Sequence, residues 1–269
     1  MRTFCPQVLK RSRTLEKIML ILVGLGLWNS KDISIKGYEE VKKADVVYIE
    51  FYTSQFHTSI ESLSQFFGKD LEIIGRRELE EESEKIISKA RENNVVILVP
   101  GDPMIATTHI ALKLEAEKLG IKTKIINGIS IINSVCSLTG LHFYRFGKSG
   151  TISWIPSKYP LDILLDNLKI DAHTLFFLDL HPKPMEITSA IKILGEVSKE
   201  ILDLYAVGIA RAGSNNPTVK CDKAKKLLKY DFGPTPHCIV FIAKTLHFIE
   251  FECLRKFADA PKELSEIVK

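Results

Sequence analysis

Cysteine is scarce in this sequence: there are five cysteines among 269 residues, and no two of them form a Cys-x-x-Cys pair. An odd, unpaired set argues against both a disulfide framework and a zinc ribbon. Chains of this kind are typical of a reducing compartment, so we expect a cytoplasmic protein. Most of the cysteines adjoin apolar runs, which favours buried, inert side chains. The five are Cys5, Cys136, Cys221, Cys238 and Cys253.

The sequence also lacks a strong excess of either charge. Lysine and arginine number 37 against 33 aspartates and glutamates, which leaves a net charge of +4. The two signs are interspersed, so we expect no direct nucleic-acid partner. The apolar and charged fractions are those of a globular protein, and the length suits one large or two medium domains.

Long apolar runs are missing as well. The run from Met19 to Trp28 follows a basic segment, as in a signal peptide, but no small-x-small cleavage site comes after it. The run is also much shorter than the roughly 20 residues that cross a bilayer as a helix. We therefore interpret residues 1–18 as an extension outside the fold, place the first strand at Met19, and expect no membrane partner.

The motifs of several common catalytic centres are absent. No two histidines have the His-x-x-x-His spacing of a zinc site, and we expect no metal. No Gly-x-Ser-x-Gly segment supplies a serine nucleophile. Chemistry in this chain would then have to come from loop residues and a bound cofactor.

The first half of the chain does contain a regular alternation of apolar strands and amphipathic helices. Strands separated by helices of this length predict β-α-β units, and nearly continuous apolar strands predict a parallel sheet covered on both faces. The expected strands are residues 20–23, 46–51, 71–74, 95–99 and 124–126. The expected helices are residues 34–44, 78–93, 107–119 and 129–138.

The second half has a different pattern, in which two closing strands are separated by only four residues and are expected to pair antiparallel. The expected strands are residues 151–155, 174–180, 205–210, 238–243 and 248–253. The expected helices are residues 161–169, 188–202 and 222–229. We predict an α/β protein of two α/β domains, with a mainly parallel sheet in residues 19–147 and a mixed sheet in residues 148–269.

Two loops at the ends of strands point to a ligand. Gly24 and Gly26 follow the first strand as in a dinucleotide-binding loop, but Asn29 replaces the third glycine and the helix starts late, so a pyrophosphate cradle is not favoured. After the fourth strand, two prolines enclose Gly101 and Asp102 in a rigid turn. Ligands of open α/β sheets bind at such strand ends. The turn also fits an ordinary loop capped by a threonine at 107 or 108.

Seven collinear segments carry a family resemblance. They are "MLILVGLGLWNSKDISIKGYEEVKKADVVYIEFYTS", "VPGDPMIATTH", "NGISIINSV", "TGLHFYRFGKS", "TLFFLDL", "ARAGSNNPT" and "DFGPTPH". Together they resemble the diphthine synthase family, within the tetrapyrrole-methylase-like superfamily of S-adenosylmethionine-dependent methyltransferases. The resemblance implies the class III methyltransferase fold, with S-adenosyl-L-methionine as methyl donor in the cleft between two domains.

The resemblance also implies cofactor-binding positions, each near the end of an expected strand. They are Leu27, Asp102, Ile105, Ser130, Ile131, Leu178, Ala212 and His237. Asp102 can accept hydrogen bonds from an ammonium group or a ribose hydroxyl, and Ser130 precedes a helix whose free amides suit a carboxylate. A lone histidine such as His237 is more often a capping or core residue, but its motif favours binding.

The acceptor implied by the resemblance is the amino group of 3-amino-3-carboxypropyl-histidine on translation elongation factor 2, methylated repeatedly in diphthamide biosynthesis. No catalytic residue is assigned; Tyr52, Thr53 and His109 are candidates for a general base only by their position near the expected loops. The family implies a homodimer, and Phe51, Phe56, Phe66 and Phe67 are candidates for its interface or for the core. A tetrapyrrole (precorrin-type) C-methyltransferase and a non-catalytic nucleotide-binding regulator stay open as alternatives.

Overall fold

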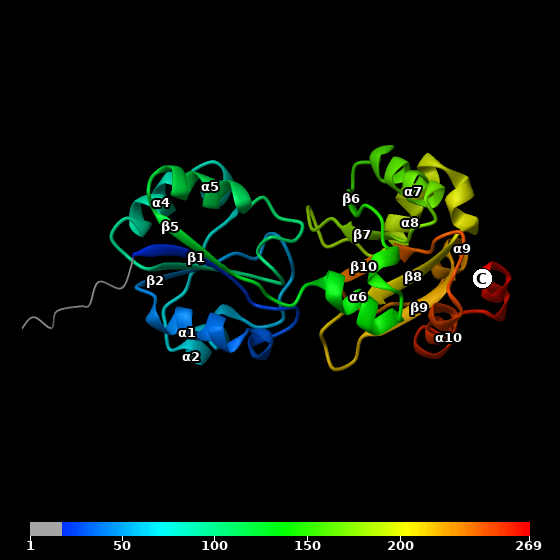
Figure 1. Cartoon of the computed structure of the whole chain (residues 1–269), viewed down its shortest axis with the longest axis horizontal. Helices are drawn as coiled ribbons and strands as arrows, with labels where there is room; N and C mark the ends of the chain where they lie inside the picture. Colours follow the sequence, from blue (N-terminus) through cyan, green and yellow to red (C-terminus); the bar gives the residue numbers. More distant parts are fainter. Residues whose placement is uncertain (1–17) are drawn as a thin grey trace, which may run out of the picture.

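The computed structural model describes residues 18–269, and the strands in this part of the chain form two five-stranded sheets (Figure 1). The expectation for residues 1–18 therefore falls, apart from Ile18, outside the described residues. Each sheet has helices on both faces. The predicted α/β class is confirmed, and so is the presence of two sheets of different kinds.

All strand pairs of the first sheet are parallel, as predicted, and the order is β3-β2-β4-β1-β5. Buried apolar residues make up β1 and β4 almost entirely, which is typical of strands covered on both faces. The strands are β1 (Met19–Gly24), β2 (Val46–Ile49), β3 (Glu72–Ile73), β4 (Val95–Val99) and β5 (Lys122–Ile126).

Two groups of helices cover the faces of the first sheet (Figure 1). The helices α1 (Ile35–Lys43) and α2 (Ile60–Phe67) bury Val41, Leu63 and Phe67 in one core. On the other face, α3, α4 and α5 surround a second core. Their bounds are α3 (Arg76–Glu80), α4 (Glu84–Ala90) and α5 (Ile110–Lys118).

Three details of the first half differ from the prediction. The helix α2 was not expected, because "SIESLSQFF" is short and follows a polar segment. The single helix expected at 78–93 is two helices, and buried Ser83 at the break donates a hydrogen bond to Glu115 of α5 at 2.7 Å. Neither Thr107 nor Thr108 is the N-cap of α5, because His109 occupies that position.

The second sheet is mixed, as predicted: β6 and β7 are parallel, whereas β10 is antiparallel to both β7 and β8. The order is β6-β7-β10-β8-β9. The strands are β6 (Gly150–Ile152), β7 (Thr174–Leu178), β8 (Tyr205–Ala210), β9 (Thr218–Lys223) and β10 (His237–Phe241).

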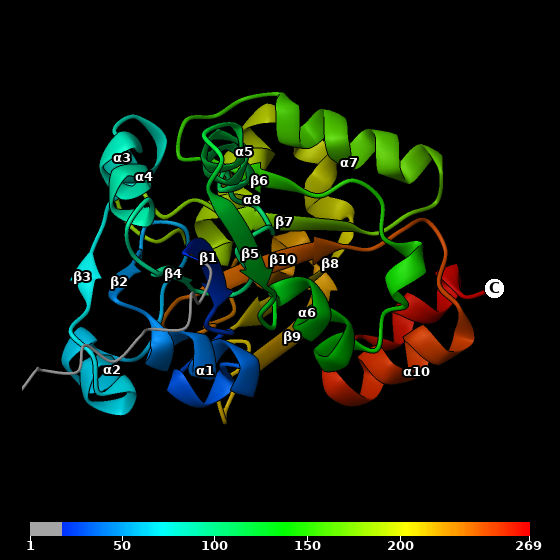
Figure 2. The same ribbon diagram turned by 60° about the vertical axis from the view of Figure 1, so that its left-hand side comes forward.

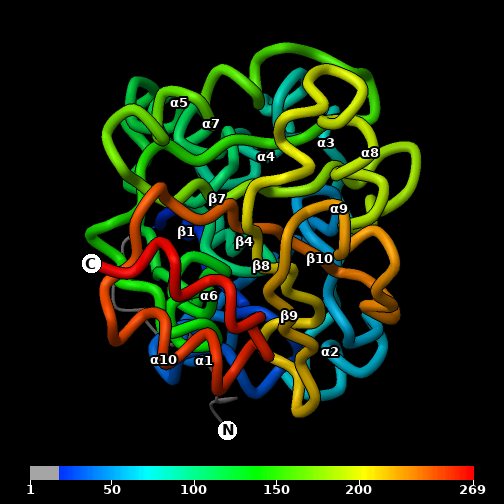
Figure 3. Tube along the Cα trace, turned by 90° about the vertical axis from the view of Figure 1, so that its right-hand side faces the viewer, coloured from blue at the N-terminus to red at the C-terminus, as the bar shows by residue number. Residues whose placement is uncertain are grey.

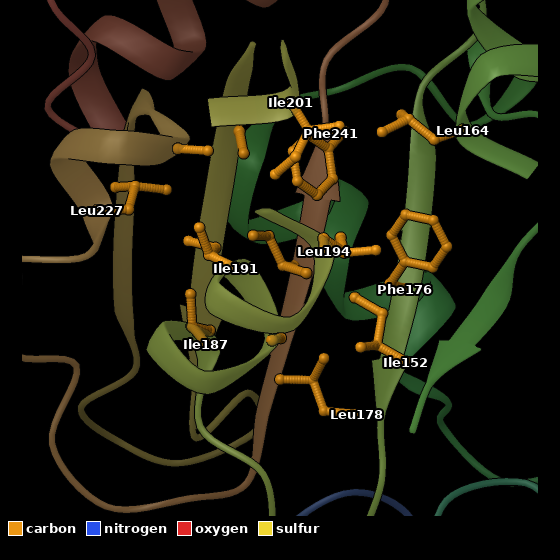
Figure 4. Packing of buried hydrophobic residues seen from close by; sticks show 14 of the residues in the cluster. Ile152, Leu164, Phe176, Leu178, Ile187, Ile191, Leu194, Ile201, Leu227 and Phe241 are labelled. Atoms are coloured by element: carbon orange, nitrogen blue, oxygen red, sulfur yellow. The ribbon is translucent and has the colours of Figure 1, made fainter. Parts of the chain in front are cut away.

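One face of the second sheet is covered by α7 (Tyr159–Lys169), α8 (Ile187–Val197) and α9 (Ala224–Leu227). Figure 4 shows the core beneath them, where Phe176 and Phe241 meet edge to face with ring centroids 6.1 Å apart. The remaining short segments of 3-10 helix are residues Ser30–Asp32, Phe143–Arg145, Lys199–Asp203 and Lys262–Ile267.

The opposite face carries α6 (Ile131–Thr139) and α10 (Phe248–Phe257), which lie side by side (Figure 2 and Figure 3). Val135 of α6 and Leu254 of α10 belong to the same core. The chain thus crosses from the first sheet to the second between β5 and α6, before the boundary expected near residue 147. The boundary itself stays a prediction.

One prediction for the second half is wrong, and one strand was not expected. Residues 248–253 begin α10 instead of forming a closing strand, so the expected hairpin is not formed. His247 is the N-cap of this helix, and Glu250 accepts a hydrogen bond from the His247 amide. "FIEFEC" alternates apolar and acidic residues, which imitates a strand. The helix expected at 222–229 is present as the shorter α9, residues 224–227, because residues 222 and 223 end β9, an edge strand that was not expected.

Candidate active site

The ends of strands from both sheets meet at one place. In the parallel first sheet, β1, β2, β4 and β5 all end at the same edge. In the second sheet, β7 and β8 end where the antiparallel β10 begins, because Cys238 pairs with Phe177 and His237 with Ala210. The loops after these strand ends face one another.

A smaller and a larger cavity adjoin between these loops, and residues of both halves line them. A cleft between two halves of a protein, lined by apolar side chains and a few polar groups, is a typical place for a cofactor. Leu27, Ile131 and Leu178 border both cavities, which makes the two spaces neighbours. Every predicted cofactor-binding residue lines at least one of them. Asp102, Ile105 and Ser130 line the larger, and Ala212 and His237 the smaller.

Closely packed glycines form the floor of the first half of the cleft. Gly26 and Gly101 exchange backbone hydrogen bonds, N to O, at 3.2 and 2.6 Å. A Cβ atom added at Gly24 or Gly128 would overlap backbone atoms of the neighbouring loop. Gly101 also has a φ of +72°, a left-handed conformation that favours glycine. The glycines therefore let three loop backbones approach closely, which accounts for the two-glycine pattern without a pyrophosphate cradle.

Asp102 is buried at the larger cavity and holds two loops together. Its Oδ1 accepts a hydrogen bond from the Met104 amide at 2.8 Å. Its Oδ2 accepts from the Asn127 side-chain amide at 2.9 Å and from the Gly128 amide at 3.1 Å. A carboxylate has about four acceptor positions, so one position is left for a ligand. The first role of Asp102 is thus to fix the loop after β5 against the loop after β4.

Ser130 begins α6 at the border of the larger cavity. Its hydroxyl accepts a hydrogen bond from the Ile132 amide, and Asn133 Oδ1 accepts from the Ser130 amide, which completes a capping box. The amino end of a helix attracts negative charge through its dipole and its free amides. The amino end of α6 at Ser130 therefore suits a carboxylate, and the binding role of Ser130 stays a prediction.

His237 starts β10 beside the smaller cavity, and its hydrogen bonds define its tautomer. Nδ1 accepts from the Ile187 amide at 3.3 Å, so Nε2 carries the proton that faces the carbonyls of Gly233 and Pro234 at 3.1 and 3.2 Å. Burial lowers the pKa of His237 below its ordinary value, and the two carbonyls only partly oppose this effect. His237 is a neutral side chain of the cavity wall.

Arg211 holds the loop that carries His237, a role that sequence reasoning missed. Its guanidinium donates to the carbonyls of Phe232 and Pro234 at 2.7 and 2.9 Å and to Thr218 at 2.6 Å. Its φ of +54° is unusual for a residue with a side chain. Next to it, a Cβ atom at Gly213 would crowd Leu27 of the first half. The two halves touch at this point.

A fully buried glutamate lies behind the loop after β2. Glu50 Oε2 accepts from the backbone amides of Tyr52 and Thr53 at 2.9 and 3.0 Å, and Glu50 Oε1 accepts from the Thr53 hydroxyl. Nε2 of buried His109 is 3.5 Å from Glu50 Oε1. The sequence offered one signal for Glu50, a charged residue inside the otherwise apolar strand expected at 46–51, but a charged residue is usually solvated.

A second buried charge cluster lies at the opposite end of the second sheet. Glu250 accepts hydrogen bonds from Arg145 Nη1 at 2.7 Å and from His173 Nε2 at 3.2 Å. His173 precedes β7, and its Nδ1 accepts from the Ala243 amide beyond β10. This cluster is remote from the two cavities and serves to attach α10 to the sheet.

The remaining expectations concern cysteines, metals and membranes. Cys221 and Cys238 are buried as expected, whereas Cys136 and Cys253 are half-buried, and all four are free thiols. Within residues 18–269, no three His, Cys, Asp or Glu side chains are grouped so that they could hold a metal. Across the same residues, no helix has the length and apolar character needed to cross a bilayer.

Comparison with known proteins shows which sequences and structures this chain is similar to. Residues 19–227 match the family of Tetrapyrrole (Corrin/Porphyrin) Methylases. A diphthine synthase of Archaeoglobus fulgidus is 58% identical over 250 residues, which cover 93% of this chain and 100% of the relative. One of Methanosarcina mazei is 42% identical, with 93% and 100% covered. A crystal structure of diphthine synthase superimposes with a TM-score of 0.92 at 57% identity, covering 93% of this chain and 100% of its own.

Proposed function

The chain belongs to the tetrapyrrole methylase family and, within it, to the diphthine synthases, and from this premise we propose its substrate and its manner of action. It is an S-adenosylmethionine-dependent methyltransferase of diphthamide biosynthesis. We propose that it repeatedly methylates the amino group of 3-amino-3-carboxypropyl-histidine on translation elongation factor 2. The observation that carries the proposal is the pair of cavities lined by every residue predicted to bind the cofactor.

The residues present fit S-adenosylmethionine. The capped amino end of α6 suits the carboxylate of the methionine part, and Asp102, with one acceptor position left, suits its ammonium group. The smaller cavity is bordered by Leu178, Ala212 and neutral His237, surroundings that suit a flat, uncharged base. When bound, the cofactor supplies a methyl group on a positively charged sulfur.

The chain's own residues contribute mainly positioning. The glycine floor, the Asp102 hydrogen bonds and the Arg211 brace fix the loops before a ligand arrives, so little ordering is left for the binding step. Holding two reactants in reactive geometry can supply roughly 7 to 11 kcal/mol of the barrier. No metal enters this proposal.

The acceptor and the assembly are further parts of the proposal. A modified histidine on a large protein has to reach the cleft, so we propose elongation factor 2 as a cytoplasmic protein partner. We also propose a homodimer. Of the four phenylalanines considered for its interface, Phe67 is fully buried, Phe51 and Phe56 pack half-buried on the same core, and Phe66 is 39% exposed. Phe66 is thus the one that best fits an interface role.

The test uses labelled S-adenosylmethionine and purified acceptors. Elongation factor 2 is taken from cells that add the aminocarboxypropyl group but lack this methyltransferase, and uroporphyrinogen and a precorrin are offered in parallel. We expect label on the protein only, with mass spectrometry counting the methyl groups. Label on a tetrapyrrole alone would overturn the assignment, and cofactor binding without any transfer would favour a non-catalytic regulator. Light scattering tests the homodimer.

A further inference from the structure

The cleft-lining residue Thr53 donates two hydrogen bonds to the buried carboxylate of Glu50. Glu50 follows β2 and has no exposed surface, whereas Thr53 borders both cavities. The Thr53 hydroxyl and the Thr53 amide both bind the Glu50 carboxylate, through Oε1 and Oε2. The loop from Glu50 to Thr53 therefore turns back on itself, with the Glu50 carboxylate inside the protein and Thr53 at the cleft.

The direction of the hydroxyl bond follows from the chemistry of the pair. An ionised carboxylate can only accept hydrogen bonds, so the single hydrogen of the Thr53 hydroxyl is committed to Glu50. The lone pairs of Thr53 Oγ1 are then left as acceptors at the cleft. A group with an N–H bond suits this position, whereas a second acceptor does not.

Resting on the proposed amine acceptor, we propose that Thr53 accepts a hydrogen bond from the amino group being methylated and conducts its proton to Glu50. An aliphatic amine is protonated near neutral pH and has no lone pair for attack until a proton leaves. After each transfer, the methylated nitrogen is again an ammonium ion. Repeated methylation thus needs one deprotonation before every attack.

The proton step balances within these groups. The N–H bond of the ammonium breaks as a new O–H bond forms on Thr53 Oγ1, while the original Thr53 O–H bond breaks and its hydrogen bonds to Glu50 Oε1. The nitrogen becomes a neutral amine and Glu50 becomes a neutral carboxylic acid. No charge is created in the buried site, because a buried anion is neutralised. The proton returns by the same route when the cleft admits water.

The neighbouring titratable groups favour Glu50 over the alternatives. Burial, together with Glu50 and Glu80, raises the pKa of Tyr52, so its phenol stays protonated and is no base. Arg76 and Glu80 of α3 pair with each other, with Arg76 Nε 2.8 Å from Glu80 Oε2. Among residues 18–269, His109 Nε2 has no hydrogen-bond partner and lies 3.5 Å from Glu50 Oε1. The centroids of the His109 and Tyr52 rings are 6.1 Å apart, but His109 itself is buried and lines neither cavity.

The experiment compares Thr53→Val, which keeps the shape and removes the hydroxyl, with Thr53→Ser, which restores it. Glu50→Gln tests the other partner. Thr123→Val is the matched control, because the Thr123 hydroxyl also donates to a carboxylate, that of Glu117, on the exposed surface away from the cleft. For each variant we measure cofactor affinity by calorimetry, single-turnover methyl transfer over a range of pH, and affinity for elongation factor 2 with S-adenosylhomocysteine bound.

We expect Thr53→Val to slow transfer at neutral pH on the order of 100-fold, the size of a lost acid–base group, with unchanged cofactor affinity. The defect should shrink above about pH 9, where an α-amino group is already deprotonated in solution. Affinity for the acceptor protein should fall about fivefold, as for one lost hydrogen bond. Thr53→Ser and Thr123→Val should resemble the wild type, and Glu50→Gln combined with Thr53→Val should be no slower than either alone.

A Thr53→Val enzyme that keeps the wild-type rate at neutral pH overturns the proposal, even if Glu50→Gln fails to fold. A slow Thr53→Val enzyme whose defect is the same at every pH also overturns it, because a merely structural role has that signature. Failure of the proposed function is distinguishable, since the wild-type enzyme would then leave elongation factor 2 unlabelled. In that case no amine is methylated, and the proposed proton transfer through Thr53 is refuted as well.

Discussion

Asp102 and Gly128 stand in the loops after two different strands, and the Asp102 Oδ2 atom accepts a hydrogen bond from the Gly128 amide at 3.1 Å. This bond joins the Pro100–Pro103 turn to the loop that leads into α6. The two prolines restrict the first loop, and this hydrogen bond restrains the second loop against it. The second loop leads to Ser130, so the hydrogen bond also helps to position the N-cap of α6.

Replacing Asp102 tests this coupling. In Asp102→Ala the donors of Met104, Asn127 and Gly128 lose their acceptor, and we expect a loss of about 2 to 4 kcal/mol in the free energy of unfolding. Cofactor affinity should fall about tenfold or more. Urea unfolding and calorimetry check the two effects, with Asp166→Ala, an exposed aspartate on α7, as control. Unchanged affinity in the folded variant would contradict a role at the cleft.

Gly128→Ala should be among the most damaging small substitutions in the chain. The added Cβ would overlap the Gly101 carbonyl, a backbone atom that cannot move aside without opening the glycine floor. We expect a loss of about 3 kcal/mol or more. Gly120→Ala is the control, because a Cβ atom at Gly120 has no neighbour within 4 Å. Its only destabilising effect comes from the φ of +77°, which is unfavourable for alanine. Equal melting temperatures for the two variants would show that the floor adapts.

The Glu250 cluster predicts a specific dependence of stability on pH. Burial alone would raise the pKa of Glu250, but the hydrogen bonds from His173 and from the amides of His142 and His247 outweigh it and hold the pKa at about 2. Because this pKa is depressed in the folded protein, its contribution is present above the ordinary glutamate pKa and is lost as pH falls toward 2. We expect about 3 kcal/mol from this group.

Urea unfolding between pH 6 and pH 2 measures that contribution. Glu250→Gln should be less stable than the wild type at neutral pH, because Arg145 loses its buried partner, and should lose less stability on acidification. Glu252→Gln, an exposed change on the same helix, is the control. Parallel pH profiles for the wild type and Glu250→Gln would refute the assignment.

His237 should titrate below the ordinary histidine range. Its pKa is lowered in the folded protein, so the unfolded chain takes up a proton at a pH where the native imidazole is still neutral. The free energy of unfolding therefore decreases as the pH falls below about 6.5. Resonances of the imidazole carbon-bound protons followed through a pH titration give the value directly. The His237→Asn variant assigns them and should show a weaker loss of stability on acidification. A pKa at or above the ordinary value would contradict the neutral, buried state.

The parts of the fold that were predictable are those with a repeated local pattern. The apolar runs of β1 and β4 and the helical periodicity of α1 suffice to predict the parallel sheet, because both faces of such strands must be covered. The failures lie where a distant partner decides. "FIEFEC" becomes a helix because Glu250 binds Arg145 and His173, which are distant in the sequence, and Leu254 packs in the core of the second sheet.

The site shows the same division. The glycines, prolines and Asp102 could be found from the sequence, because they stand at strand ends and restrict the backbone. Glu50 and Arg211 could not be found in this way, because their roles depend on burial and on a positive φ. The sequence alone does not indicate that a charged residue will be buried, because the hydrogen-bond donors that stabilise it are placed around it only by the fold.

The chain crosses between its two sheets once before α6, and Leu27, Ile131 and Leu178 then border both cavities. A molecule held there shares its binding free energy with both halves of the protein. By thermodynamic linkage, either half can then unfold only at the expense of that binding. If the proposed methyl donor binds in this cleft, we expect its concentration to raise the melting temperature of both halves together.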